Sequence, residues 1–173
     1  MKNLKFLTYF LIAGFFAFGL AACGDDDGDD DMGVQESITD LARSNPDLST
    51  LAALLDANPD LAALLDSDGD FTVFAPTNAA FAALLVAIDQ PSASRVPNDV
   101  LRRILLYHVI DGQRIMSGDI TDGARVTTAL SATDQLTFST ANGVVINGSS
   151  TVVTADVEAS NGYVHVVDAV LVS

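Results

Sequence analysis

Basic residues are scarce in this 173-residue sequence, which has eight Lys and Arg against 23 Asp and Glu and a net charge of −15. Both lysines fall within the first five residues, and the other basic residues are six arginines spread between Arg43 and Arg125. A nucleic-acid-binding face needs clustered positive charge to displace counterions from phosphates. The sequence therefore excludes nucleic acid as an expected partner.

Cysteine is also scarce, since Cys23 is the only one and no intramolecular disulfide can form. The chain lacks a G-x-S-x-G elbow, a P-loop and a dinucleotide fingerprint, and it has only two histidines, His108 and His165. We therefore expect no enzymatic activity, no cofactor and no metal site. A hydrolase whose Ser-His-Asp triad uses one of these histidines is the least favoured alternative.

The N-terminal 22 residues have the order of an export signal. Positive charge in Met1–Lys5 is followed by an almost unbroken apolar run, Phe6–Leu20, and by two alanines. This order is typical of a signal peptide, which we assign to residues 1–22. An uncleaved membrane-spanning helix is the alternative, but the run is short for one and no basic cluster follows it.

The end of this segment resembles the bacterial lipobox, in the residues Leu20-Ala21-Ala22-Cys23. The resemblance implies that Cys23 becomes the mature N-terminus and carries acyl chains, so that a lipid anchor holds the protein on a membrane. Two or more chains anchor stably because each buried methylene contributes about 0.8 kcal/mol.

An acidic segment follows, so residues 23–33 are expected to comprise the lipidated cysteine and a spacer. Asp25–Asp31 contains six aspartates, which repel one another and favour a solvated chain. Two sharper interpretations stay open. The carboxylates are suitable calcium ligands, and acidic residues after a lipidated cysteine resemble surface-export signals of some Gram-negative lipoproteins.

Residues 34–173 are expected to form one domain that opens with helices. Asn45–Leu48 and Asn58–Leu61 repeat the pattern Asn-Pro-Asp-Leu, in which Asn suits the N-cap and Pro the first helical position. Each repeat precedes a short apolar helix. Asp66–Asp70 imitates the first half of a calcium loop, but the later ligand positions fail, so we predict a turn.

The stretch Phe71–Phe81 organises the domain, because its first half has the composition of a buried strand and its second half that of a helix. Pro76 ends the strand, and Thr77 or Asn78 is expected to cap the helix. Phe74 and Phe81 are expected to enter one core.

The next helix is predicted from Pro97 through the run that ends at Ile110, and the chain then becomes β. Asn142-Gly143 favours a type I′ hairpin turn. In the last predicted strand, His165 is expected to face solvent or a neighbouring strand, and Asp168 to be hydrogen-bonded or to lie where the strand leaves the core. Helices followed by hairpins predict an α+β domain with a mainly antiparallel sheet. The remaining predicted strands cover residues 125–129, 135–140, 144–146, 151–157 and 163–172.

Three segments together resemble the fasciclin domain family: Phe71–Phe81, the pair Tyr107-His108, and Asn161–Leu171. The resemblance implies a β-sandwich wedge with N-terminal helices packed against it, and adhesion or matrix binding without a cofactor. By motif position, Tyr107 and His108 are the implied partner-binding residues. A purely structural role for both is the alternative, since His108 lies on the apolar face of its predicted helix.

These features together predict an exported, lipid-anchored interaction protein of the bacterial cell envelope, on the outer membrane and exposed at the surface. A protein or polysaccharide of the cell surface or matrix is the expected partner. A small-ligand or lipid carrier with a pocket of several hundred Å3 between helices and sheet is the alternative.

Overall fold

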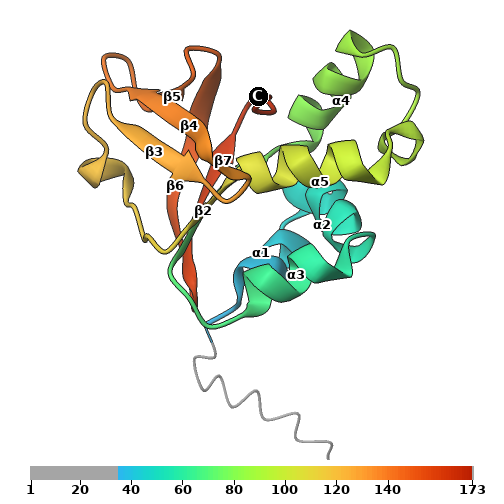
Figure 1. The fold of residues 1–173 in the computed structure, drawn as a ribbon, viewed down its shortest axis with the longest axis horizontal. Coiled ribbons are helices and arrows are strands. Elements are labelled where there is room, and N and C mark those ends of the chain that lie inside the picture. The colour runs from blue at the N-terminus through green and yellow to red at the C-terminus, as the bar shows by residue number, and fades with distance from the viewer. Residues whose placement is uncertain (1–34, 173) are drawn as a thin grey trace, which may run out of the picture. The chain divides into compact units, whose positions relative to one another are not determined.

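Helices dominate the first half of the folded chain, interrupted by one strand at Phe71–Pro76, and strands dominate the second half, as the sequence predicts (Figure 1). The structure is a computed structural model that describes residues 35–172. The predicted signal peptide, Cys23 and the acidic spacer lie outside the described residues. The α-helices are α1 (Ile38–Ser44), α2 (Ser49–Asp56), α3 (Pro59–Asp66), α4 (Asn78–Ala87) and α5 (Asn98–Tyr107). The strands are β1 (Phe71–Pro76), β2 (Val109–Asp111), β3 (Arg125–Thr128), β4 (Ser131–Ser139), β5 (Val145–Ile146), β6 (Ser150–Ala159) and β7 (Gly162–Val167). Short 3₁₀ turns are η1 (Pro46–Leu48), η2 (Ala93–Arg95) and η3 (Ser117–Asp119).

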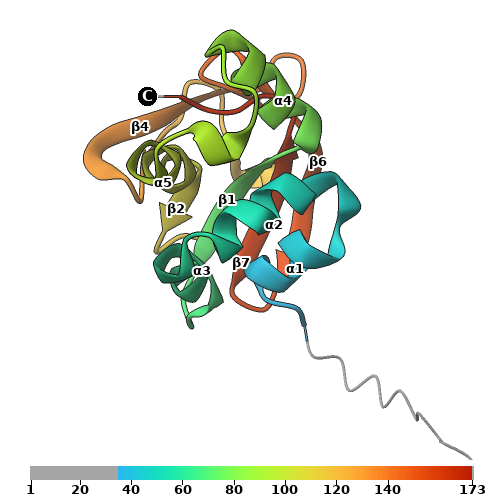
Figure 2. The same ribbon diagram turned by 90° about the vertical axis from the view of Figure 1, so that its right-hand side faces the viewer.

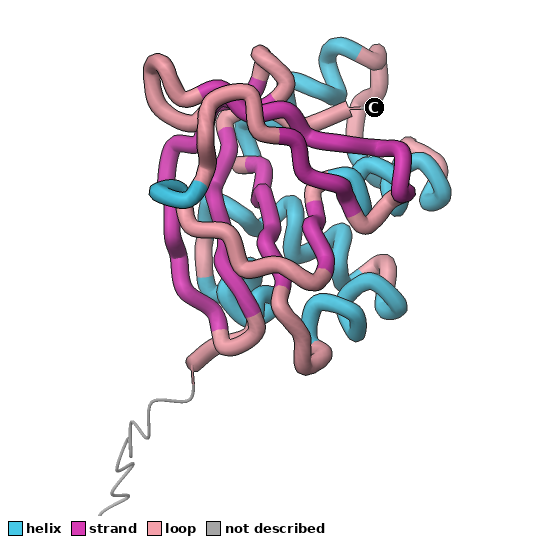
Figure 3. Tube along the Cα trace, turned by 60° about the vertical axis from the view of Figure 1, so that its left-hand side comes forward, coloured by secondary structure: helices cyan, strands magenta, loops and turns pink. Residues whose placement is uncertain are grey.

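The strands form one sheet in the order β2-β1-β7-β6-β5-β4-β3. Every neighbouring pair is antiparallel except β1 and β7, which run parallel with Phe74 opposite His165. The two ends of this order meet, because the Ala129 amide donates a hydrogen bond to the Val109 carbonyl at 2.7 Å. The sheet therefore folds back on itself while the helices cover its other side (Figure 3). The α+β, mainly antiparallel fold predicted from the sequence is confirmed.

Strand β1 divides the interior into two apolar clusters, because its alternate residues face opposite sides of the sheet. Val73 packs in the cluster under the helices, whereas Phe74 packs in the cluster between the two halves of the folded sheet. Phe81 of α4 belongs to the helical cluster. Both phenylalanines are buried, but the prediction that they share one core is wrong, since Phe74 points to the opposite face.

The junction between β1 and α4 follows the predicted chemistry. Pro76 is the last residue of β1, and the Thr77 hydroxyl accepts a hydrogen bond from the Ala80 amide at 3.2 Å, which caps α4. The repeated asparagines behave differently from each other. Asn45 caps η1 with its side chain. Asn58 takes the predicted N-cap position of α3, but its side chain donates to the Leu54 carbonyl and makes no capping bond.

Several β elements differ from the sequence-based expectations. Val109–Asp111 is a strand, β2, rather than the end of a helical run. The turn at Asn142-Gly143 is not type I′, because only Gly143 has a positive φ, whereas type I′ requires two such residues. The last strand ends at Val167. Asp168 follows it as an exposed residue, and its carboxylate accepts a hydrogen bond from the Thr151 amide at 2.7 Å, as expected.

Among residues 35–172, no single helix is long and apolar enough to cross a membrane. The bent pair Pro46–Asp56 and Pro59–Asp66 passes by length and composition alone. Most of the leucines in this pair are buried in the helical cluster, as expected of core helices in a folded domain.

Candidate interaction site

Helix α4 is apolar on every side, yet only Ala80 and Phe81 are buried among its ten residues. No charged residue occurs from Phe71 to Ile88. A helix with this composition is ordinarily enclosed by protein on all sides. Val86 nevertheless leaves 82% of its surface exposed, so α4 presents apolar surface that residues 35–172 do not cover.

The exposed side of α4 borders a groove of about 320 Å3 that it forms with α5 and the last described residues. Val172 and Ile88 are among the most exposed large apolar residues of residues 35–172. The groove is lined by Leu84, Ile88, Val100, Arg103, Ile104 and Val172. We call this surface the α4–α5 groove. Its walls are aliphatic, and Arg103 supplies the one charged lining side chain, so it suits an apolar partner that carries a negative group.

Arg103 makes no ion pair with another described residue, whereas three of the other five arginines do. Arg43 pairs with Asp56, Arg102 with Asp60 and Arg114 with Asp70. On helix α5, Arg102 thus forms an ion pair with α3, whereas the guanidinium of Arg103 lies at the groove.

The groove lies far from the point where the described chain begins. In Figures 1 and 2, α4 is at one end of residues 35–172, and the start of the chain before α1 is at the other. A tether attached before residue 35 therefore leaves the domain at the end opposite α4.

Tyr107 and His108, the residues implied to contact a partner, are both buried. The Tyr107 hydroxyl donates to the Gln135 carbonyl at 3.3 Å and accepts from the Asn147 side-chain amide at 3.0 Å. These bonds join the end of α5 to β4 and to the turn after β5. Both side chains therefore make contacts inside the domain. Their direct contact with a partner stays a prediction.

Both ring nitrogens of His108 are occupied by the backbone. Nδ1 lies 2.7 Å from the Ile104 carbonyl and Nε2 lies 2.9 Å from the Leu171 amide. Since a carbonyl only accepts and an amide only donates, this pattern assigns the proton to Nδ1 and the lone pair to Nε2. Burial lowers the pKa of His108 to about 4, because the charged ring would lose its hydration. His108 is therefore neutral at pH 7 and connects α5 to the C-terminal segment.

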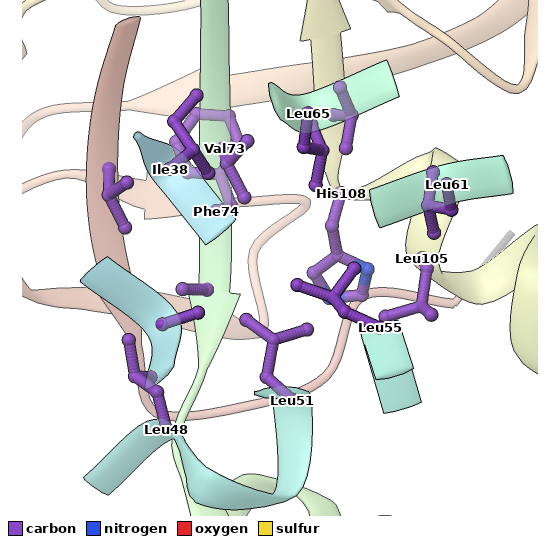
Figure 4. A pocket seen from close by; sticks show the side chains of 14 residues that line it. Ile38, Leu48, Leu51, Leu55, Leu61, Leu65, Val73, Phe74, Leu105 and His108 are labelled. Atoms are coloured by element: carbon purple, nitrogen blue, oxygen red, sulfur yellow. The ribbon is translucent and has the colours of Figure 1, made fainter. Parts of the chain in front are cut away.

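The space between the helices and the sheet is nearly filled. A cavity of about 20 Å3 remains there, little more than the room for one water molecule. Its lining is aliphatic and aromatic except for His108, whose nitrogens are already bonded (Figure 4). This near-solid interior counts against a carrier with a preformed pocket of several hundred Å3.

His165 is fully buried and faces the neighbouring strand β1, so the solvent-facing alternative is wrong and the strand-facing alternative is confirmed. Its Nε2 lies 2.8 Å from the Ile115 carbonyl, and its Nδ1 accepts from the Asp156 amide at 3.2 Å. Burial is the main cause that lowers its pKa. The Asp156 carboxylate is bonded instead to Ser117, through the amide at 2.6 Å and the hydroxyl at 2.5 Å. In a Ser-His-Asp triad the serine hydroxyl is hydrogen-bonded to the histidine. Here the Ser117 hydroxyl donates to the Asp156 carboxylate instead, so these three residues are not arranged as a triad.

No group of three or more His, Cys, Asp or Glu side chains within residues 35–172 is arranged to hold a metal ion. The segment Asp66–Asp70 is the end of α3 and an exposed bend, as predicted. The calcium interpretation of Asp25–Asp31 lies outside the described residues.

The α4–α5 groove was not predicted from the sequence. The uncharged run from Phe71 to Ile88 was the available signal, but helical spacing alone assigned its apolar residues to the core. Which of them lack a covering partner depends on how α4 is placed.

Comparison with known proteins supports the resemblance. The sequence profile of the fasciclin domain matches residues 46–173. A Synechocystis protein, sll1483, is 40% identical over 139 residues, which cover 78% of this chain and 72% of that protein. The cell surface glycolipoprotein MPB83 of Mycobacterium bovis is 37% identical over 143 residues, which cover 80% of this chain and 61% of that protein.

Two similar animal proteins are longer. The chain is 34% identical over 123 residues to the pig transforming growth factor-beta-induced protein ig-h3 and covers 18% of it. The fold is similar to that of a domain pair from the insect cell adhesion molecule fasciclin I, with a TM-score of 0.64 and 20% identity over 80% of this chain and 51% of that one. The profile match and the relatives show that the chain belongs to the fasciclin domain family.

Proposed function

We propose that this protein is an interaction module of the bacterial cell surface that binds a protein or polysaccharide partner in adhesion or matrix attachment. The observation that carries the proposal is the α4–α5 groove of this strongly acidic protein, an aliphatic surface next to Arg103, which makes no ion pair within residues 35–172. Relatives named as a cell surface glycolipoprotein and a cell adhesion molecule support a role of this kind.

We further propose that a lipid on Cys23 anchors the protein to the outer membrane, with the acidic segment as a spacer of roughly 30 Å when extended. The tether enters the domain at the end opposite α4, so the α4–α5 groove is free to face away from the membrane. Cys23→Ala should move the protein from the membrane fraction to the soluble fraction. Protease treatment of intact cells should remove the domain if it faces outward.

For Tyr107 and His108, we propose an indirect role in binding. Their hydrogen bonds fix the end of α5 and the segment that reaches Val172, two elements that border the groove. Substitutions at these positions should therefore change binding by displacing the groove, together with a loss of stability. A variant that loses binding at unchanged stability would instead indicate direct contact.

The decisive experiment introduces Ile88→Asp into the full chain, with Val153→Asp as the matched control. Both residues are exposed and apolar, but Val153 lies on β6 among the strands. Cells with Ile88→Asp should lose attachment or biofilm formation, and cells with Val153→Asp should keep it. Equal attachment of both variants and the original protein would refute the proposal.

A further inference from the structure

We propose that the α4–α5 groove docks a second copy of this chain, with the two α5 helices antiparallel about a twofold axis. This inference rests on the proposed function and names the partner of the same surface. It is carried by the absence of charge along α4 and by two charged residues of α5 that have no ion-pair partner among residues 35–172.

The first observation concerns repulsion between copies. A protein with a net charge of −15 repels its own copies, and a contact between them is least costly where no carboxylates face each other. The run from Phe71 to Ile88 contains no charged residue, and its exposed part is α4. Of the residues that line the α4–α5 groove, Ile88, Val100 and Val172 leave 40% or more of their surfaces uncovered. Two copies can bury these side chains together.

The second observation is charge complementarity on α5. Asp99 and Arg103 are both exposed and stand four residues apart, a spacing at which side chains of one helix can pair. Within residues 35–172, neither makes an ion pair or a side-chain hydrogen bond. If the twofold axis crosses α5 midway between these two residues, each Asp99 lies opposite the Arg103 of the other copy, and the pair occurs twice because the interface is symmetric. The same helix turn in each copy thus provides the Asp99 of one ion pair and the Arg103 of the other.

A lipid surface fits this face less well. The described chain begins at the end of the domain opposite α4, so a tether joined there leaves the groove free for a partner other than the membrane. The overall negative charge also opposes approach to anionic lipids.

The groove is small, so the contact between two free copies should be weak. Tethering many copies to one surface, or to two facing surfaces, raises their effective concentration and favours the same contact. The dimer should therefore be measured on cells that carry the full-length chain.

The test introduces Val100→Cys into the full chain on intact cells and adds a short bis-maleimide cross-linker. Val153→Cys is the matched control, since it is also an exposed valine but lies on β6. The unmodified chain gives the background from Cys23. Val100→Cys should give a species of twice the chain mass well above the control. Equal cross-linking at the two positions would overturn the inference.

Charge exchange then tests the geometry. Asp99→Arg and Arg103→Asp should each lower the cross-linked fraction of the Val100→Cys protein about tenfold, because each places like charges together. The double exchange Asp99→Arg with Arg103→Asp should restore it, since both reciprocal pairs return. Failure of the double exchange to restore cross-linking would overturn the inference.

The inference and the proposed function can fail separately. Cross-linking of Val100→Cys to a different protein would overturn self-docking and leave a binding role of the groove intact. If Val100→Cys gives the dimer while Ile88→Asp leaves attachment unchanged, the second copy is supported and the adhesive role fails.

Discussion

The ring of His165 stacks on the ring of Phe74, with centroids 5.4 Å apart and planes inclined by 24°. The two residues are direct partners in the parallel pair β1–β7, the only parallel pair in the described sheet. Phe138 of β4 packs against the same phenylalanine at 5.6 Å. Phe74 therefore joins the central strands to the half of the sheet that folds over them.

Phe74→Ala should destabilise the domain by about 3–5 kcal/mol, from lost burial and the cavity left between the two halves of the sheet. The side chain is fully buried, and its neighbours belong to several strands, so the site cannot collapse easily. Denaturant unfolding measures this loss. Val153→Ala, at an exposed position of β6, should change stability by less than about 0.5 kcal/mol. Equal midpoints for the two variants would show that Phe74 contributes no packing.

The switch from β1 to α4 could be predicted because its chemistry is local. Pro76 cannot continue a central strand, and Thr77 supplies a capping oxygen within a few residues. The order of helices and strands followed from similar signals. The strand β2 was missed because Val109 and Ile110 continue the apolar pattern of α5 without a break.

The orientation of His165 could not be predicted, because alternation identifies a solvent face only when one face of a strand is exposed. Strand β7 lies between β1 and β6, with helices on one face and the folded-over strands on the other. Both faces are therefore buried, and a polar ring is tolerated because Ile115 and Asp156 satisfy its nitrogens. The α4–α5 groove could not be predicted either, because nothing in the local sequence distinguishes an apolar residue that stays exposed from one that other elements cover.

Because His108 is buried and neutral, we expect the folded domain to lose stability in mild acid. Its pKa falls from the ordinary value of 6.5 to about 4 in the folded protein, because burial disfavours the charged ring. Below pH 6.5 the unfolded chain therefore binds a proton that the folded chain does not. Unfolding free energy should fall as the pH drops from about 6.5 to about 4, by about 3 kcal/mol from this residue.

The control for this effect is His108→Gln, which cannot take up the proton. It should be less stable than the original protein at pH 7, because the Leu171 amide or the Ile104 carbonyl loses its partner. The gap between the two proteins should narrow as the pH falls towards 4. Unfolding free energies that decline in parallel over this range would show that His108 is not the titrating group.

Removal of the Asp156 carboxylate is expected to open the structure locally rather than to unfold the whole domain. Its carboxylate receives both the amide and the hydroxyl of Ser117, and these bonds are the main cause that lowers its pKa. Asp156→Ala should release the loop that contains η3, because the Ser117 amide loses its acceptor. Hydrogen exchange at Ser117 should then accelerate while exchange in the buried strand β1 changes much less.

A conservative variant separates this effect from the backbone at position 156, whose φ is 58°. Asp156→Asn tolerates such a conformation and keeps one acceptor oxygen, so it should accelerate exchange less than Asp156→Ala. Equal acceleration in both variants would mean that the carboxylate charge, not the acceptor, holds the loop.

Among the glycines of the domain, Gly162 is the one where an added side chain would clash most closely with another atom. A Cβ at this position would lie 2.0 Å from the Phe71 carbonyl oxygen, a backbone atom that also sets the start of the parallel pair β1–β7. Gly162→Ala should therefore push the two central strands apart and cost about 1–3 kcal/mol or more. Gly118→Ala is the matched control, since a Cβ there meets nothing within 4 Å and should leave stability almost unchanged. Thermal unfolding of both variants measures the difference, and equal melting temperatures would mean that β1 and β7 do not approach as closely at this point as the structure places them.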